Sequence, residues 1–165
     1  MPDLLAHALL AYAVARLLAW RVDWLTPGYT TVAMAGAFVP DLAKAELLVP
    51  SARVESLLAV PFDWFALHTG GGTLVAVLVG GVLVGADERR RVLGLLGLGA
   101  ATHLLADALL LSPSGRSYAV LWPLTRYHPP TPGLYLSTDP TPTVVAALVA
   151  AVVWAASERR DRETA

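Results

Sequence analysis

Long apolar stretches separated by short polar segments dominate the sequence, and this pattern predicts an all-α protein. A helix needs about 20 mostly apolar residues to cross the hydrocarbon core of a bilayer. Stretches near that length cover residues 4–20, 29–48, 65–86 and 92–112, and a shorter one covers 142–157. We therefore expect an integral membrane bundle of about five hydrophobic helices.

The segment between the last two predicted helices, about 112–141, does not continue this pattern. It is rich in proline, and it also carries aromatic residues, among them Tyr118, Trp122 and Tyr127. Disordered segments are poor in aromatic residues, so we expect a long ordered loop. A further connection, 50–61, is predicted to be an amphipathic segment or a loop.

Proline and glycine interrupt two of the predicted helices. Pro40 removes one backbone hydrogen bond and can open the helix beside Asp41, or it can simply end a short helix. Gly70, Gly71 and Gly72 each lower helix stability by about 1 kcal/mol relative to alanine. We expect them where another helix or a ligand closely approaches the backbone.

The composition places the chain in a membrane and limits its partners. Hydrophobic residues make up 56% of the sequence, whereas soluble domains hold about 45–50% apolar residues even when glycine is counted. A net charge of −1 leaves no basic stripe for phosphates, so we expect membrane lipid and a small-molecule or lipid substrate as partners, and no nucleic acid. The absence of cysteine excludes thiolate ligands, so histidine and carboxylate must hold any metal.

Length and arginine positions predict the organisation of the chain. The 165 residues fit a single domain, with 1–157 as the helical membrane domain and 158–165 as a charged C-terminal tail. Lysine and arginine favour the cytoplasmic ends of membrane helices. The arginines in 89–91 and 159–162 therefore predict a cytoplasmic C-terminus and, after five crossings, an N-terminus outside. We expect a multi-pass protein of the plasma or inner membrane.

His103 and Asp107 stand out because they lie inside an apolar stretch. They are four residues apart, so they share one face of a helix. An aspartate near the middle of a membrane costs at least about 2.5–3.5 kcal/mol on insertion scales, and it therefore needs a partner or a function. One alternative is that the two side chains bond only each other or the backbone and hold helices together.

Under the predicted orientation, metal-capable side chains from four helices share the outer half of the membrane. They are His7, Asp41, His68, His103 and Asp107. Three imidazoles and two carboxylates suit a divalent metal, with zinc as the expected ion, and they leave a position open for water. Asp107, Asp41 and Asp63 are the candidate catalytic carboxylates, since a carboxylate can act as general base or orient a histidine.

Other polar residues at this depth have two interpretations each. Asp63 and His128 could complete a second metal position, or they could be a helix cap and a solvated loop residue. Arg116 and Arg126 could receive an anionic group of a substrate, although contact with lipid headgroups is the ordinary role of such residues.

These residues also carry a resemblance to a known family. The sequence resembles the YdjM-like inner-membrane metal-dependent hydrolases in the order of its motifs: an early His7, Pro40-Asp41, His68-Thr69, His103-Leu-Leu-Ala-Asp107 with the following S-P-x-G, and Leu121-Trp122-Pro123-Leu124. That family is similar in ligand order to zinc-dependent phospholipase C. The resemblance implies an all-helical metal site and phosphoester chemistry.

The sequence departs from the family pattern at two places. The family usually reads P-D-x-D, whereas Ala43 stands at the place of the second acid. The family also tends to read H-R-G-x-T-H-S, whereas Asp63 replaces the first histidine and Leu67 the threonine. The sequence therefore leaves two alternatives open. The site could hold a single metal ion, or the protein could keep the fold without catalysis.

Residues and resemblance together predict a membrane-embedded, metal-dependent hydrolase. We expect it to cleave an ester or phosphoester bond near the outer leaflet, with a lipid as one possible substrate. A small transporter or proton relay, in which the same intramembrane acids carry ions, is one alternative. A non-catalytic metal-binding membrane scaffold, whose polar residues join helices, is another.

Overall fold

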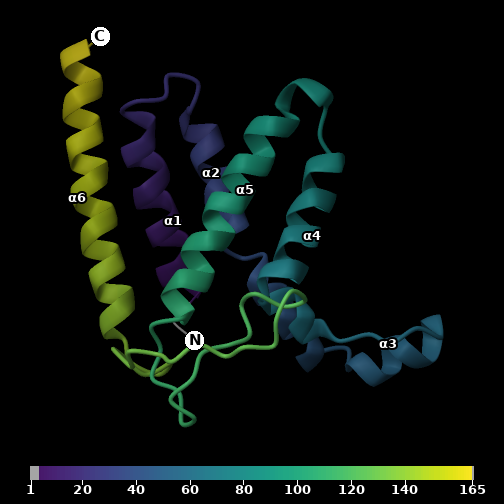
Figure 1. Ribbon diagram of the computed structural model, residues 1–165. Helices are drawn as coiled ribbons and strands as arrows, with labels where there is room; N and C mark the ends of the chain where they lie inside the picture. Colours follow the sequence, from purple (N-terminus) through teal and green to yellow (C-terminus); the bar gives the residue numbers. More distant parts are fainter. Residues whose placement is uncertain (1–3, 165) are drawn as a thin grey trace.

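The computed structural model describes residues 4–164, and over this range the chain is helical with no β-strand. The helices in chain order are α1 (Leu4–Ala19), α2 (Pro27–Gly36), η1 (Pro40–Leu47), α3 (Ser51–Leu58), η2 (Trp64–His68), α4 (Gly70–Val82), α5 (Ala86–Asp107) and α6 (Thr141–Thr164), where η marks a 3₁₀ helix. In Figure 1, α1, α2, α4, α5 and α6 form a bundle, and α3 projects from one end of it. The predicted all-helical fold is confirmed.

The segment expected as one helix over 29–48 is divided where Pro40 allows a break. α2 ends at Gly36, a turn follows, and Pro40 opens the 3₁₀ helix η1. The ten residues of α2 rise about 15 Å, which is half of a hydrocarbon core of about 30 Å. The chain therefore turns inside the bundle, and Asp41 is buried there.

Other helix limits also differ from those expected. The third expected helix is the short η2 followed by α4, and the connection over 50–61 contains α3. α5 begins at Ala86, within the charged turn, because Asp87 and Glu88 interact favourably with the N-terminus of a helix. α6 continues through Thr164, so the charged segment expected as a tail is helical as far as the structure describes it.

Within residues 4–164, α6 is the one helix both long and apolar enough to cross a membrane, over Thr141–Glu163. α1 and α4 are apolar but shorter, with 16 and 13 residues. A bundle of five crossings therefore stays a prediction.

Small residues fill the inside of the bundle, and large apolar residues cover its outside. Apart from His7, every buried residue of α1 is an alanine. Leucines and valines of α4 and α6 are exposed, including Leu74, Leu78, Leu148 and Val152. Membrane bundles have this arrangement, because small residues let helices approach closely while large apolar side chains contact lipid.

α2 and α5 pack closely because a glycine lies on each side of their contact. A Cβ atom on Gly99 would lie 1.9 Å from the carbonyl oxygen of Ala33, and one on Gly36 would lie 2.3 Å from that of Leu96. No larger residue fits at either position without moving backbone. The contact holds α5 against the end of α2, beside the carbonyl group of Ala37.

The irregular segment between α5 and α6 packs against one end of the bundle. The amide of Leu111 donates to the carbonyl of Tyr135 at 2.7 Å, and the amide of Leu134 donates to that of Leu109 at 2.9 Å. These bonds hold the second half of the segment against the residues that follow α5.

The first half of the same segment explains the first two of the three consecutive glycines. The amide of Gly70 donates to the carbonyl of Val120 at 2.6 Å, and the amide of Gly71 donates to that of Trp122 at 2.9 Å. A Cβ atom on Gly70 would lie 2.4 Å from the Val120 carbonyl oxygen. The close approach predicted for these glycines is therefore made by a loop at Gly70 and Gly71. At Gly72 it is made by the 3₁₀ helix η2, where a Cβ atom would lie 1.9 Å from the carbonyl oxygen of Ala66.

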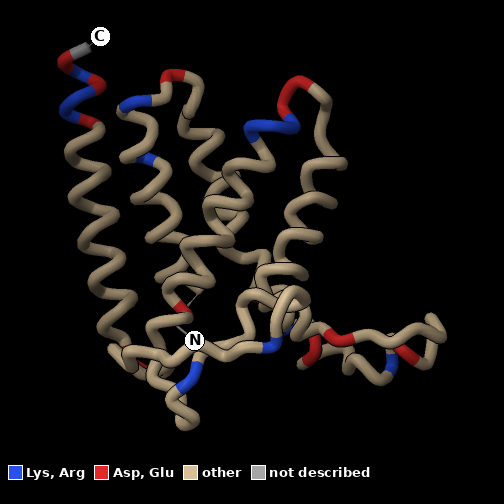
Figure 2. The backbone as a smooth tube through the Cα atoms, in the orientation of Figure 1, with Lys and Arg blue, Asp and Glu red and all other residues tan. Residues whose placement is uncertain are grey.

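The arginines of α1, α5 and α6 gather at the opposite end of the bundle (Figure 2). The guanidinium of Arg16 lies 3.3 Å from the carboxylate of Asp161, and Arg160 donates to the carbonyl of Trp20 at 3.1 Å. These contacts place the ends of α1 and α6 side by side. This is the end for which arginine content predicts a cytoplasmic location.

Replacing Gly99 tests the α2–α5 contact. We expect Gly99→Ala to lower the unfolding temperature of the detergent-purified protein, since overpacking costs about 1–3 kcal/mol. Gly97→Ala is the matched control, because a Cβ atom there meets nothing within 4 Å and alanine favours a helix. Equal unfolding temperatures for the two variants would contradict the close contact.

Candidate metal centre

Histidine and aspartate side chains from distant parts of the chain meet at the end of the bundle that faces the irregular segment. His7 lies near the start of α1, Asp41 in η1, His68 at the end of η2, and His103 and Asp107 near the end of α5. All are buried, and the exposed fraction is 0% for His7 and His103 and 2% for Asp107. We call these residues the metal cluster.

Asp107 lies at the centre of the metal cluster. Its Oδ1 atom is 3.4 Å from Nε2 of His7, and its Oδ2 atom is 2.9 Å from Nε2 of His68 and 3.4 Å from Nε2 of His103. Nε2 of His103 is also 3.9 Å from Oδ1 of Asp41. His103 thereby belongs to two sets of potential ligands, one with His7 and Asp107 and one with Asp41 and His68, each with its ligand atoms within 4.8 Å of one another.

Backbone carbonyl groups fix the orientation of two of the histidines. Nδ1 of His103 is 2.7 Å from the carbonyl oxygen of Ala37, and Nδ1 of His68 is 3.3 Å from that of Pro40. A carbonyl oxygen can only accept, so we assign the proton to Nδ1, and the neutral ring then keeps a lone pair on Nε2. Metal-binding histidines are commonly held in this way by their other nitrogen.

The facing polar atoms of the metal cluster have no hydrogen-bond partners. This is true of both nitrogens of His7, Nε2 of His68 and His103, Oδ1 of Asp41 and both oxygens of Asp107. Buried lone pairs and carboxylates that face one another need positive charge between them, from a proton or from a metal ion. Zinc ligands at 2.0–2.2 Å from the ion lie about 3.3–3.6 Å apart in a tetrahedral site, similar to the 3.4 Å contacts of Asp107. The residues therefore fit a divalent metal.

The sequence pattern of the YdjM inner membrane protein family matches residues 1–164. This chain belongs to that family. The match covers every residue of the metal cluster as well as the irregular segment, and it supports a location in the inner membrane. No curated protein and no solved structure matches the chain. The further likeness to zinc-dependent phospholipase C, implied by the motifs, stays a prediction.

Lys44 pairs with Asp41 of the metal cluster. It directly follows Ala43, the position at which this YdjM family member lacks the second acid of the P-D-x-D motif. Ala43 is buried at the place of the second acid. Nζ of the next residue, Lys44, lies 2.8 Å from Oδ2 of Asp41. Lys44 therefore neutralises one oxygen of this carboxylate and leaves Oδ1 facing His103. The three-residue spacing between Asp41 and Lys44 was the signal in the sequence for this pair.

Asp63 and His128 lie outside the two sets of potential ligands found among the described residues. Oδ1 of Asp63 accepts from the amide of Phe65 at 2.8 Å and thereby caps η2. Nδ1 of His128 lies 2.9 Å from the carbonyl oxygen of Ser117. Both residues line a cavity beside the metal cluster, so the proposed catalytic role of Asp63 stays a prediction.

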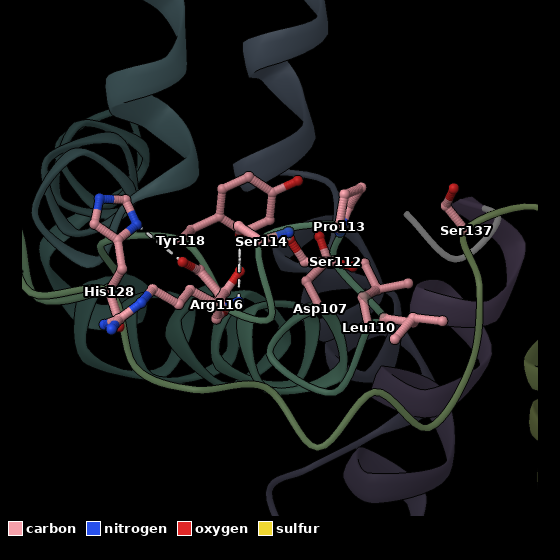
Figure 3. Close-up of a pocket in the computed structure, with 11 residues that line it drawn as sticks. Asp107, Leu110, Ser112, Pro113, Ser114, Arg116, Tyr118, His128 and Ser137 are labelled. Carbon is pink, nitrogen blue, oxygen red and sulfur yellow. Dashed lines mark hydrogen bonds between the residues drawn. The ribbon is translucent and has the colours of Figure 1, made fainter.

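Among the described residues, three cavities border the metal cluster: the smallest, of about 130 Å³, lies beside His68 and Lys44, and two are larger. The first of these two, of about 380 Å³, is lined by Asp107 and by polar residues of the irregular segment, and we call it the polar cavity (Figure 3). The second, of about 610 Å³, is lined by His68 and by Phe62, Phe65 and Trp122, and we call it the apolar cavity.

Tyr118 and His128 line both the polar and the apolar cavity. The ring of Tyr118 stands 4.7 Å from that of His68. Burial raises the pKa of the Tyr118 phenol, and the charges of Asp107 and Asp41 raise it further, so its hydroxyl group is protonated at neutral pH. Sequence reasoning used Tyr118 only as a sign of order, because nothing local marks which loop residue will cover a site.

Metal content tests the metal cluster directly. We expect the purified protein to contain zinc by mass spectrometry, and the His103→Ala, Asp107→Ala double variant to contain almost none. Chelation should lower the unfolding temperature of the unmodified protein by about 5–10 °C, since a ligand at a hundred times its Kd stabilises by about 2.7 kcal/mol.

His128→Ala is the matched control for this experiment, because it removes an imidazole near the metal cluster without removing a member of it. It should keep its zinc. Equal, near-zero zinc in the unmodified protein and the double variant would refute the metal site.

Proposed function

We propose that this protein is a membrane-embedded metal-dependent hydrolase that cleaves an ester or phosphoester bond near the outer leaflet. The observation that carries the proposal is a buried set of imidazole and carboxylate groups whose facing atoms lack hydrogen-bond partners and which adjoins the polar and the apolar cavity. Asp107 lies at ion-pair distance from three imidazoles but forms no hydrogen bond with them, and each buried polar group without a hydrogen bond costs about 1–3 kcal/mol.

The donor set of the metal cluster suits hydrolysis. Zinc bound by histidine and carboxylate lowers the pKa of a bound water to about 7 and so supplies hydroxide at neutral pH. His7, Asp41, His68, His103 and Asp107 are the proposed ligands. Because Asp107 has two unpaired oxygens and borders the polar cavity, it can also accept the proton of an attacking water.

The reaction is balanced by water alone. The oxygen of water bonds to the acyl carbon or to phosphorus, the bond to the leaving oxygen breaks, and that oxygen takes up a proton. Asp41 and Asp63 are further candidates for this proton transfer. Asp63 borders the apolar cavity next to His68, so it faces the side from which a leaving group would depart.

The proposed site faces away from the cytoplasm, and the proposed protein crosses the membrane several times. Support comes from the distribution of arginine along the bundle: the arginines of α1, α5 and α6 gather at one end (Figure 2), whereas His103 and Asp107 lie near the opposite end of α5 from its arginines. Arginine-rich ends are retained in the cytoplasm.

Hydrolysis of chromogenic substrates tests the proposed activity. Zinc-loaded protein in detergent should hydrolyse at least one of 4-nitrophenyl phosphate, bis(4-nitrophenyl) phosphate and 4-nitrophenyl butyrate. Asp107→Asn keeps the size of the side chain but removes its charge, and should lower kcat by about 100-fold or more.

Asp23→Asn is the control, since Asp23 is exposed between α1 and α2, and it should leave the rate unchanged. Zinc-loaded protein that hydrolyses no ester or phosphoester would refute the hydrolase and leave a metal-binding scaffold. Solute uptake into liposomes that Asp107→Asn abolishes would instead indicate a transporter.

The lack of cysteine makes the orientation measurable. In intact cells whose inner membrane is accessible, Thr138→Cys in the irregular segment should react with a membrane-impermeant maleimide. Asp87→Cys, in the turn before the arginines of α5, should react only after the membrane is permeabilised. Both positions are exposed. The reverse pattern would overturn the proposed location of the site.

A further inference from the structure

We propose that the polar and the apolar cavity form one substrate site, in which Arg116 and Ser117 bind a phosphate group and the apolar cavity binds a hydrocarbon chain. The ligand class is therefore a phosphate-bearing lipid. This inference rests on the proposed hydrolase function and adds the substrate and the residues that recognise it.

The polar cavity carries the groups that bind an anion. Arg116 lines it, and its Nη1 atom donates to the backbone carbonyl of His128 at 3.3 Å. Among residues 4–164, no carboxylate lies within ion-pair distance of this guanidinium. The bond to His128 uses one of five N–H donors, so the others can form the charge-assisted, two-pronged contact that arginine makes with phosphate.

Ser117 supplies a second, independent observation. It also lines the polar cavity, it is only 8% exposed, and its hydroxyl group has no hydrogen-bond partner. Its backbone amide and carbonyl are both occupied, by the carbonyl of Pro129 and by Nδ1 of His128. A buried hydroxyl without a partner costs free energy, and a phosphate oxygen in the cavity would provide the missing partner.

The loop backbone fixes both groups beside the metal cluster. Arg116 pairs with Pro130 in an isolated antiparallel bridge, and the amide of Ser117 donates to the carbonyl of Pro129 at 2.8 Å. In Figure 3, Arg116, Tyr118 and His128 lie to one side of Asp107, and Ser137 lies to the other. A phosphate held by Arg116 and Ser117 would therefore share the polar cavity with Asp107, a member of the metal cluster.

The apolar cavity completes the lipid site. Phe62, Phe65, Trp122 and Ala119 line it, and it borders the metal cluster at His68. Aromatic side chains of this kind pack against hydrocarbon, so the cavity suits the apolar part of a lipid.

The two cavities share Tyr118 and His128, so they lie side by side, and the proposed ligand spans both. Its phosphate would lie on the Asp107 side and its hydrocarbon on the His68 side. The ester bond that joins them would then lie against the metal cluster. A free phosphate would fill only the polar cavity, and a neutral lipid would fill only the apolar one.

Binding and kinetics of named ligands test the proposal. With the zinc-loaded protein in detergent micelles, dioleoyl phosphatidic acid should bind at least ten-fold more tightly than either inorganic phosphate or dioleoylglycerol. Arg116→Met should weaken phosphatidic acid binding by about ten-fold or more, Ser117→Ala by a smaller factor, and Arg116→Lys should retain part of the affinity. Zinc content should not change in any of these variants.

Arg126→Met is the matched control. Arg126 is an exposed arginine of the same irregular segment and lines neither cavity, so its loss should leave binding unchanged. An equal effect of Arg116→Met and Arg126→Met would show general attraction to the micelle and overturn the site. Equal affinity for inorganic phosphate and phosphatidic acid would overturn the lipid assignment.

The measurements separate this inference from the proposed function. If the protein hydrolyses chromogenic esters but Arg116→Met and Ser117→Ala behave like the unmodified protein toward phosphatidic acid, in both binding and KM, the phosphate site is wrong and the hydrolase stands. If no ester is hydrolysed but Arg116→Met selectively weakens phosphatidic acid binding, the lipid site stands and the hydrolase is wrong.

Discussion

A carboxylate that is almost completely removed from water needs positive charge close to it, and Asp107 imposes this requirement on the whole bundle. It is 2% exposed, and three imidazole nitrogens lie within 3.4 Å of its oxygens. A buried charge without a partner destabilises a fold by about 3–5 kcal/mol. Because the histidines come from α1, η2 and α5, a cation bound among them would join these elements. The site is thus also a structural centre of the protein.

The packing around the metal cluster brings backbone carbonyl groups, as well as side chains, into contact with its histidines. The glycine contact between α2 and α5 lets the Ala37 carbonyl group reach Nδ1 of His103 at 2.7 Å. Pro40 has no N–H group to donate to this Ala37 carbonyl, three residues before it. The carbonyl of Pro40 itself, at the start of η1, lies 3.3 Å from Nδ1 of His68. A continuous helix over this region would use both carbonyl groups in its own hydrogen bonds. The interruption of α2 therefore orients two histidines and exposes Asp41 to the cluster in one step.

The sequence predicted the chemistry of this region better than its geometry. The sequence alone shows the apolar stretches and the polar residues that lie in or beside them, because each is recognised from its neighbours along the chain. These residues are His7, Asp41, His68, His103 and Asp107. The end of a short helix before Pro40 was one of the two alternatives that the sequence left open. The start of α5 and the end of α6 were not predicted, because the apolar pattern does not mark helix limits that lie within charged segments. For Gly70 and Gly71 the sequence predicted a close approach but not the partners, because Val120 and Trp122 lie about fifty residues further along the chain. The roles of Ser117 and Tyr118 were not predicted, because they depend on which surfaces the irregular segment covers.

The irregular segment links the stability of the fold to access to the site. Its bonds to Gly70 and Gly71 hold the chain beside η2, and this brings the ring of Tyr118 to 4.7 Å from His68. The same segment supplies Arg116 and Ser117 to the polar cavity and Trp122 to the apolar one. Loops on a rigid scaffold commonly carry recognition, because they can vary without disturbing the core. Here the helices would determine which ion is held, and the segment between α5 and α6 would determine which molecule reaches it.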